Sequence, residues 1–314
     1  MNSCCAGHET EPVTCRLCGD TRIRSLGAVP DSDYFAGRVL GRLIDGGHLW
    51  RCDACQSMFR HPILPASSYL DLYTNGVADE WSTDGGRQDL AIIRGIIAQK
   101  ARPGGMLDVG CGAGDFLLTL PAELTKYGVE PSVAAAAAAR KRGISILAPT
   151  LAQLSPQRGF DVITMIDVIE HVADPGDLLD QALPHLAPGG SLIIATGDTS
   201  NVLWRRVFRS RFWYSSFPEH ITFPSLRYFH IWHEGRGLQA PTAVQLKYRR
   251  IAFWQAALYF VSQVVYLVSP WLLNRVARGL EWVRRAPRPR RRLFSPGAPG
   301  VFTDHQIVMI QRLP

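Results

Sequence analysis

The chain has 314 residues, enough for one large domain or two smaller ones. It is 46% apolar and 19% charged, an ordinary globular composition that excludes a disordered chain. The formal net charge is +7, and the six arginines of residues 284–292 (RRAPRPRRR) supply almost all of that surplus. This run is either a solvated loop or a contact with an anionic surface.

The N-terminal stretch MNSCCAGHETEPV lacks the apolar core of a signal peptide. We therefore expect no export and a cytoplasmic location. Seven cysteines in an unexported chain favour thiolate chemistry or a metal site over disulfides.

Residues 1–65 carry two Cys-x-x-Cys pairs, Cys15 with Cys18 and Cys52 with Cys55. Each pair can point two thiolates at one ion, and two pairs complete a tetrahedral site typical of zinc. Four cysteines close the coordination shell, so the pattern predicts a structural Zn²⁺ in a zinc-ribbon-like domain. The alternative is two unrelated thiol pairs. Further candidate ligands, if the terminus is not frayed, are Cys4, Cys5 and His8.

No dense stripe of basic and aromatic residues occurs in this region, so we expect no nucleic-acid partner.

Residues 66–105 predict a helical bridge that caps the next domain. Its second half, DLAIIRGIIAQKA, places Leu90, Ile93 and Ile97 at helical spacing, and Pro103 ends that helix.

Residues 106–120 contain the stretch around which the chain is organised, LDVGCGAGDF. A short apolar run is followed by Gly110, Gly112 and Gly114 and then by apolar residues at helical spacing. This pattern predicts strand, glycine turn and helix, the entry unit of a parallel α/β sheet. Such a turn lets the backbone approach a ligand closely, although NAD, FAD and plain packing use it too.

A second strand is predicted at Lys126–Val129, ending at Glu130. An acidic residue about twenty positions beyond the glycine turn is placed to accept both hydroxyls of a ribose. By itself this carboxylate does not distinguish S-adenosylmethionine (SAM) from NAD.

Four blocks in order resemble the class I SAM-dependent methyltransferases: DVGCGAG, YGVEPS, FDVITMIDVIEHVADP and LAPGGSLIIAT. The resemblance covers Met106–Thr196 and, more weakly, the chain to Leu246. It implies a Rossmann-like seven-stranded α/β sheet over residues 106–250, completed by a final strand in residues 301–314, with SAM as cofactor. The cofactor-binding residues expected from it are Asp108, Gly110, Cys111, Gly112, Gly114, Glu130, Ile166 and Asp167.

The same resemblance extends to residues outside the cofactor blocks. Glu170 and His171 resemble the family's EH signature, either as a brace of the loop or in catalysis. The helix before the first strand caps the cofactor pocket in related enzymes, so Tyr73 or Trp81 is expected there unless both pack in the core. The cysteine-rich start is similar to that of bacterial methyltransferases that include sugar C-methyltransferases.

Glu219 and His220 are the predicted catalytic residues. Histidine titrates near neutrality and can take a proton from a hydroxyl or an activated carbon, and a neighbouring carboxylate raises its basicity. Sugar C-methyltransferases with a zinc domain carry Tyr-x-Glu-His at a similar place. Here Phe217 stands in the tyrosine position, which weakens the parallel. The alternative for His220 is a brace of the loop.

Residues 251–300 predict an apolar helical insertion, since Ile251–Leu273 has no charged residue over 23 positions. At steps of four and three residues, one side of this helix carries a polar-aromatic stripe: Gln255, Tyr259, Ser262, Tyr266 and Ser269. A helix of this length measures roughly 35 Å and could span a bilayer. The flanking segments TAVQLKY and VFTDHQIVMIQRLP, however, predict neighbouring strands of one sheet, which excludes a single span. Peripheral contact of residues 251–292 with an anionic membrane, at its inner face, or a partner or homodimer contact remain open.

These features predict transfer of the SAM methyl group to an oxygen or carbon of a sugar-like, nucleotide- or lipid-linked, or other small acceptor. Alignment of the reacting atoms and a base for the leaving proton are the main requirements. The alternatives are a quinone or phenolic small-molecule O-methyltransferase and a catalytically silent binding module with the same fold.

Overall fold

The structure is a computed structural model that describes residues 12–76, 87–100, 105–155, 159–269 and 301–314. Several sequence-based expectations lie outside these ranges: Cys4, Cys5, His8, Trp81, Pro103 and residues 284–292.

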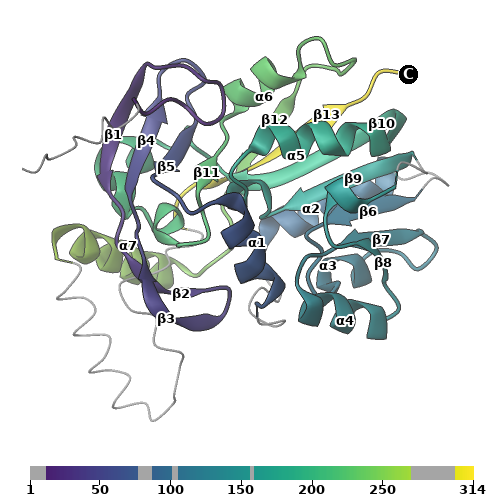
Figure 1. Ribbon diagram of the computed structural model, residues 1–314, viewed down its shortest axis with the longest axis horizontal. Helices are drawn as coiled ribbons and strands as arrows, with labels where there is room; N and C mark the ends of the chain where they lie inside the picture. The colour runs from purple at the N-terminus through teal and green to yellow at the C-terminus, as the bar shows by residue number, and fades with distance from the viewer. Residues whose placement is uncertain (1–11, 77–86, 101–104, 156–158, 270–300) are drawn as a thin grey trace, which may run out of the picture.

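The large sheet has seven strands in the order β12-β13-β10-β9-β6-β7-β8 (Figure 1). The strands are β6 (Met106–Val109), β7 (Lys126–Val129), β8 (Ser145–Ala148), β9 (Phe160–Ile166), β10 (Leu186–Gly197), β12 (Thr242–Leu246) and β13 (His305–Gln311). Neighbouring strands from β8 to β10 are parallel, whereas β13 is antiparallel to both β10 and β12. The predicted sheet is therefore confirmed, including the antiparallel pairing of β12 with β13 at its edge.

Helices cover both faces of this sheet. The helices are α2 (Gln88–Lys100), α3 (Asp115–Leu118), α4 (Val133–Lys141), α5 (Pro175–Ala182) and α6 (Leu226–His233). Along β10 the buried residues alternate, because Ile193 packs with α2 and α3 on one side and Leu192 packs with α5 and α6 on the other. This double cover explains the continuous apolar runs of the central strands.

The N-terminal residues build a second, four-stranded sheet of order β1-β4-β5-β11. Its strands are β1 (Ile23–Ala28), β4 (His48–Cys52), β5 (Met58–His61) and β11 (Thr222–Phe223), beside a hairpin of β2 (Ser32–Phe35) and β3 (Arg38–Ile44). Strand β11 lies more than 150 residues further along the chain than β5 and pairs with it. Cys15, Cys52 and Phe59 share one buried cluster with the large sheet, so the two sheets have a common core.

The remaining helical elements connect and cover these sheets. They are α1 (Ala66–Thr74), α7 (Phe253–Val268), η1 (Leu151–Gln153), η2 (Ile169–His171), η3 (Leu183–His185), η4 (Leu203–Phe208), η5 (Arg209–Arg211) and η6 (Trp213–Ser216). Among the described residues, no helix is both long and apolar enough to cross a membrane.

Helix α7 is shorter than the predicted 251–273 stretch and packs with its polar side inward. Gln263 is buried, accepts a hydrogen bond from the backbone N–H of Trp213 and donates one to the carbonyl oxygen of Arg211. Tyr266 of the predicted polar-aromatic stripe is buried as well. The apolar side faces outward, with exposed Phe253, Trp254, Leu258, Val261 and Val268.

Candidate functional site

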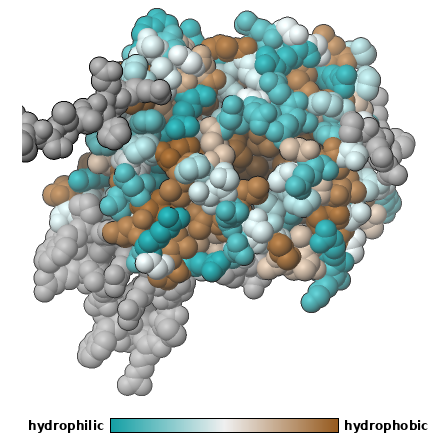
Figure 2. Space-filling model, viewed as in Figure 1, coloured by the Kyte–Doolittle hydropathy of each residue, from teal (hydrophilic) through white to brown (hydrophobic). Residues whose placement is uncertain are grey.

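A cavity of about 520 Å³ lies at the carboxyl ends of β6, β7 and β9. This edge is where ligands bind in open parallel sheets. Its wall includes the glycine turn and Glu130 at one end, and His171, Tyr73 and Arg249 at the other. In the surface view the molecule is hollowed near the middle of one face (Figure 2).

The glycine turn needs glycine for two separate reasons. A Cβ on Gly110 would lie 2.6 Å from Cγ2 of Val168, and the φ of Gly110 is +71°. At Gly112 φ is +55°, but a Cβ would meet no atom within 4 Å, and the residue lines the cavity. The space in front of Gly112 is therefore open to a ligand that lies directly against the backbone.

Glu130 and Asp108 supply buried carboxylates beside this turn. Glu130 accepts the backbone N–H groups of Gly112 and Ser132, each at 2.8 Å. Asp108 accepts the hydroxyl of Thr164 at 2.6 Å, and burial raises its pKa to about 7. All the expected cofactor residues except Gly114 line the cavity, and Gly114 caps helix α3 in the left-handed conformation.

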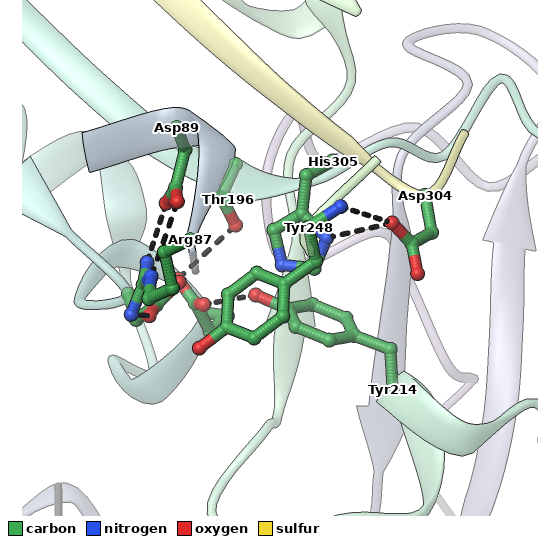
Figure 3. Close-up of polar contacts among 9 residues, drawn as sticks. Arg87, Asp89, Thr196, Tyr214, Tyr248, Asp304 and His305 are labelled. Carbon is green, nitrogen blue, oxygen red and sulfur yellow. Dashed lines mark hydrogen bonds and ion pairs between the residues drawn. The ribbon is translucent and has the colours of Figure 1, made fainter. Parts of the chain in front are cut away.

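Arg87 and Asp167 hold the middle of the cavity. The Arg87 guanidinium pairs with Asp89 at 2.5 Å and Asp167 at 2.6 Å, and it lies 4.5 Å from the ring centre of Tyr248 (Figure 3). Burial alone would lower the pKa of Arg87, but the two carboxylates raise it well above the ordinary value. Oδ1 of Asp167 is buried without a hydrogen-bond partner among the described residues, so a donor on a bound molecule would complete it.

His171 lines the far end of the cavity. Its Nδ1 lies 2.7 Å from the hydroxyl of Tyr73 and 3.2 Å from the carbonyl oxygen of Glu219. A carbonyl can only accept, so the second contact favours the tautomer with the proton on Nδ1. Burial lowers the pKa of His171 to about 4, which keeps the ring neutral at physiological pH.

Glu170 lies behind His171 and is fully buried. Its carboxylate accepts the hydroxyls of Tyr214 and of Thr196, both shown in Figure 3, and burial raises its pKa to about 7. Ligand-type atoms of Glu170, His171 and His220 lie within 4.8 Å of one another. Hydrogen bonds engage all three side chains in one polar network behind this wall.

Glu219 and His220 do not line the cavity. Glu219 accepts the backbone N–H of Ala36 at 2.9 Å, in the turn between β2 and β3. His220 donates from Nδ1 to the carbonyl oxygen of Tyr214 at 2.7 Å, and its ring lies 4.8 Å from that of His171. Their catalytic role stays a prediction. In the described structure His171 lines the cavity, and Glu219 and His220 do not.

The four predicted metal ligands meet in one cluster. Sγ atoms are 3.6 Å apart in the pairs Cys15–Cys55 and Cys18–Cys52, and all four lie within 4.8 Å of one another. Disulfides are excluded because an S–S bond measures about 2.05 Å. Tetrahedral zinc with Zn–S bonds of about 2.3 Å requires sulfur atoms about 3.8 Å apart, so the donor set fits. Hydrogen bonding from Cys15 lowers the pKa of Cys55 to about 5, which favours a thiolate there.

Sequence reasoning missed Arg87, Tyr248 and Arg249 as cavity residues. None of the three residues belongs to a motif. An isolated antiparallel β-bridge pairs Arg87 with Arg249, and no local pattern predicts that pairing. His171 was visible as part of the EH pair, but its exposure to the cavity was not. Tyr73 does line the cavity, as the resemblance implied for one of two aromatic residues.

Comparison with known proteins agrees with this fold and site. A family model described as a methyltransferase domain matches residues 88–242. The ubiquinone biosynthesis O-methyltransferase of Bradyrhizobium sp. (strain ORS 278) is 35% identical over 100 residues, covering 29% of this chain and 39% of that protein. The enzyme of the same description from Caulobacter sp. (strain K31) is 38% identical over 102 residues, covering 29% and 40%. The chain thus spans less than half the length of these curated relatives.

Among solved structures, an N-methyltransferase of Haemonchus contortus, in complex with phosphomonomethylethanolamine and S-adenosylhomocysteine, matches with a TM-score of 0.50 and 17% identity. The match covers 82% of this chain and 62% of that one, and it is a likeness of fold. The strand order, the glycine turn and the acidic residue after the second strand define a Rossmann-like α/β domain. Residues 88–242 thus match the methyltransferase-domain family.

Proposed function

We propose that the protein transfers the methyl group of SAM to an oxygen or carbon of a small polar acceptor, with a sugar-like molecule as the preferred class. One observation carries this proposal: a single cavity joins the glycine turn and Glu130 to an end lined by aromatic and charged side chains. Aromatic faces beside hydrogen-bonding groups suit the apolar faces and hydroxyls of a ring-shaped acceptor. The side chains of this acceptor end are Tyr69, Tyr73, Arg87, His171, Tyr248 and Arg249.

Different residues of the chain would then bind the cofactor and accept the proton. Glu130, held by two backbone N–H groups, is oriented to accept the ribose hydroxyls, while Gly112 leaves room for the cofactor. SAM supplies an electrophilic methyl group. His171, kept neutral by burial, takes the proton that the acceptor loses, and Tyr73 fixes the imidazole through Nδ1. His220 lies behind His171 as a positioning residue.

Replacing His171 with glutamine is expected to lower kcat by about 100-fold or more, because general-base catalysis contributes 10²–10⁴-fold. SAM affinity should be nearly unchanged, since His171 lies at the other end of the cavity. In the wild type the contribution of His171 to the rate should be constant from about pH 8 to pH 5 and fall as the pH approaches the His171 pKa of about 4. A change of rate near pH 7 would instead report on Asp108 or Glu170, whose pKa values are about 7. The measurement is a pH series of turnover with an accepted substrate.

The matched control is His220→Gln, which removes the neighbouring imidazole from behind the cavity wall. If His220→Gln abolishes turnover while His171→Gln retains it, the proposed base is wrong and the Glu219–His220 prediction gains support. Retained turnover with a flat pH profile in both variants would remove histidine from the reaction.

The second candidate is O-methylation of a phenolic or quinone-type acceptor. The curated relatives of the glycine-turn region carry that activity in their names, and Tyr248 and Tyr73 offer aromatic surfaces for a flat ring. SAM consumption with nucleotide sugars, lipid-linked glycans and catechols separates the two acceptor classes. A silent binding module predicts no turnover in all three sets, and calorimetry that finds no SAM binding would favour it.

We also propose that the four cysteines hold a structural Zn²⁺. Three of the four are buried, and Ser225 donates to the carbonyl oxygen of Cys55, so the cluster joins the N-terminal sheet to the connection between β11 and α6. The metal would stabilise that junction and take no part in methyl transfer, because no coordination position is left open.

The exposed side of α7 supports the proposed peripheral contact with an anionic membrane. Phe253, Trp254 and Val268 are 88%, 66% and 79% exposed, an uncommon position for large apolar side chains on a helix whose polar side is buried. Leu258→Glu with Val261→Glu should abolish flotation with anionic vesicles. Ile231→Glu on α6, an exposed apolar residue elsewhere, is the control. Loss of a dimer in sedimentation, with no vesicle binding by the wild type, would instead identify this side as a homodimer contact.

A further inference from the structure

A second cavity of about 360 Å³ lies between the N-terminal sheet and the segment that follows β10. Strand β1 contributes Arg24, Ser25 and Leu26, and helix η4 with the residue after it contributes Arg205, Arg206 and Arg209. The two cavities share no lining residue. Four of the six lining residues are arginines, so this arginine pocket differs in chemistry from the methyltransferase cavity.

A fifth arginine, Arg51, lies beside this arginine pocket. Strand register sets Arg51 of β4 opposite Arg24 of β1, so both side chains leave the sheet on one face. Two positions earlier, Leu49 packs with Trp204 of η4 in a buried cluster, which identifies this face as the one that η4 covers. Arg51 therefore lies between β1 and η4.

Two of these guanidinium groups have buried nitrogen atoms without a hydrogen-bond acceptor among the described residues. Arg51 is 4% exposed, yet its Nε and Nη1 have no partner among the described residues. Nε of Arg205 is buried and equally without a partner. Burial, together with the charges of Arg205 and Arg24, lowers the pKa of Arg51 to about 10. Buried donors without acceptors cost free energy, so a ligand that supplies oxygen atoms would stabilise this arrangement.

Protein carboxylates compensate this charge only in part. Within the described ranges, the one salt bridge to these five arginines is Arg24 with Asp53 at 3.6 Å, between half-exposed side chains. Asp198 acts on Arg205 without a direct contact. Arginine binds phosphate oxygens through several directed N–H groups. Phosphate is therefore the anion that matches a cluster of guanidinium groups.

We propose that the arginine pocket binds a phosphate or diphosphate group, carried either by a soluble molecule or by a lipid headgroup. Exposed apolar side chains flank the arginines on the same segment, namely Val202, Leu203 and Val207. They give a lipid-borne phosphate additional contacts, whereas a soluble phosphate needs the arginines alone. The site is separate from the proposed methyl transfer and does not depend on it.

The test is calorimetric titration of the full-length protein with inorganic pyrophosphate at fixed ionic strength. The wild type should bind saturably with one pyrophosphate per chain. Arg205→Ser with Arg206→Ser should weaken that binding at least about tenfold, because charge-assisted hydrogen bonds are lost. The charge-matched control is Lys141→Ser with Arg227→Ser, two exposed residues on other helices, and it should change affinity by less than about twofold.

Vesicle flotation separates the two sources. The ligand is a lipid phosphate if three results hold together. The wild type floats with phosphatidic acid vesicles, pyrophosphate releases it from them, and the Arg205/Arg206 variant does not float. Pyrophosphate binding without any such vesicle dependence indicates a soluble phosphate compound. The proposal is overturned if pyrophosphate does not saturate the wild type, or if the control pair weakens binding as much as the Arg205/Arg206 pair. SAM affinity and melting temperature, measured on the same samples, should match the wild type and report separately on the methyltransferase site.

Discussion

Replacing Cys55 with serine is expected to release the metal and to lower Tm by about 10 °C or more. Binding of structural zinc is worth about 10–16 kcal/mol in zinc-finger peptides, and losing one of four ligands forfeits much of it. The effect should reach beyond residues 1–65, because β5 pairs with β11 and Ser225 donates to the carbonyl oxygen of Cys55. Elemental analysis and thermal melting measure the two outcomes.

The consequence for function should be one-sided. SAM affinity is expected to change little, since the cofactor end is built from β6 and β7. Turnover should fall, because the loop that ends at β11 supports the wall around His171 through the carbonyl oxygen of Glu219. Cys111→Ser is the control for the metal content only, because Cys111 is a buried cysteine outside the cluster that lines the cofactor cavity. A wild-type protein without stoichiometric zinc would remove the metal proposal altogether.

Replacing Glu130 with alanine is expected to weaken SAM binding by about 100-fold or more. Each charge-assisted hydrogen bond to the ribose contributes about 1.5–3 kcal/mol before water compensates. Alanine also frees the N–H groups of Gly112 and Ser132, so the turn itself loses its support. Calorimetry with SAM gives the affinity directly.

Asp177→Ala is the matched control for this variant. It removes an acidic residue from the first turn of α5 that does not line the cavity, although Gln181, which donates a hydrogen bond to it at 2.7 Å, does. The control should bind SAM as the wild type does. Equal affinity in wild type and Glu130→Ala would mean that the cofactor does not use this carboxylate.

Local sequence signals were enough for the strands of the large sheet and for the cofactor end. The strand predicted at 126–129 has those bounds in the structure, and Glu130 follows it. This success has a physical basis. A buried parallel strand needs a continuous apolar run, and a backbone that approaches a ligand needs glycine, so both are written in consecutive residues.

The fixed spacing of the two cysteine pairs predicted four candidate ligands, and the structure brings their sulfur atoms together. Their place in the molecule was not predicted. Strand β11 joins β5 across more than 150 positions of chain, and no short-range signal of two residues could predict that pairing. The N-terminal residues were expected as a module, and only the tertiary structure shows them sharing one core with the large sheet.

Side-chain direction was the other property that the sequence left open. Both histidines, His171 and His220, were recognised, but which one lines the cavity depends on how the loops after β9 and before β11 pack together. On α7 the periodicity revealed two different sides, and the buried one proved to be polar because Gln263 meets backbone groups of another segment. Spacing along the chain therefore determined the elements and the glycine turn with its acidic residue. Contacts between distant segments decided the acceptor end, the arginine pocket and the outward apolar side, because those depend on partners that no local pattern contains.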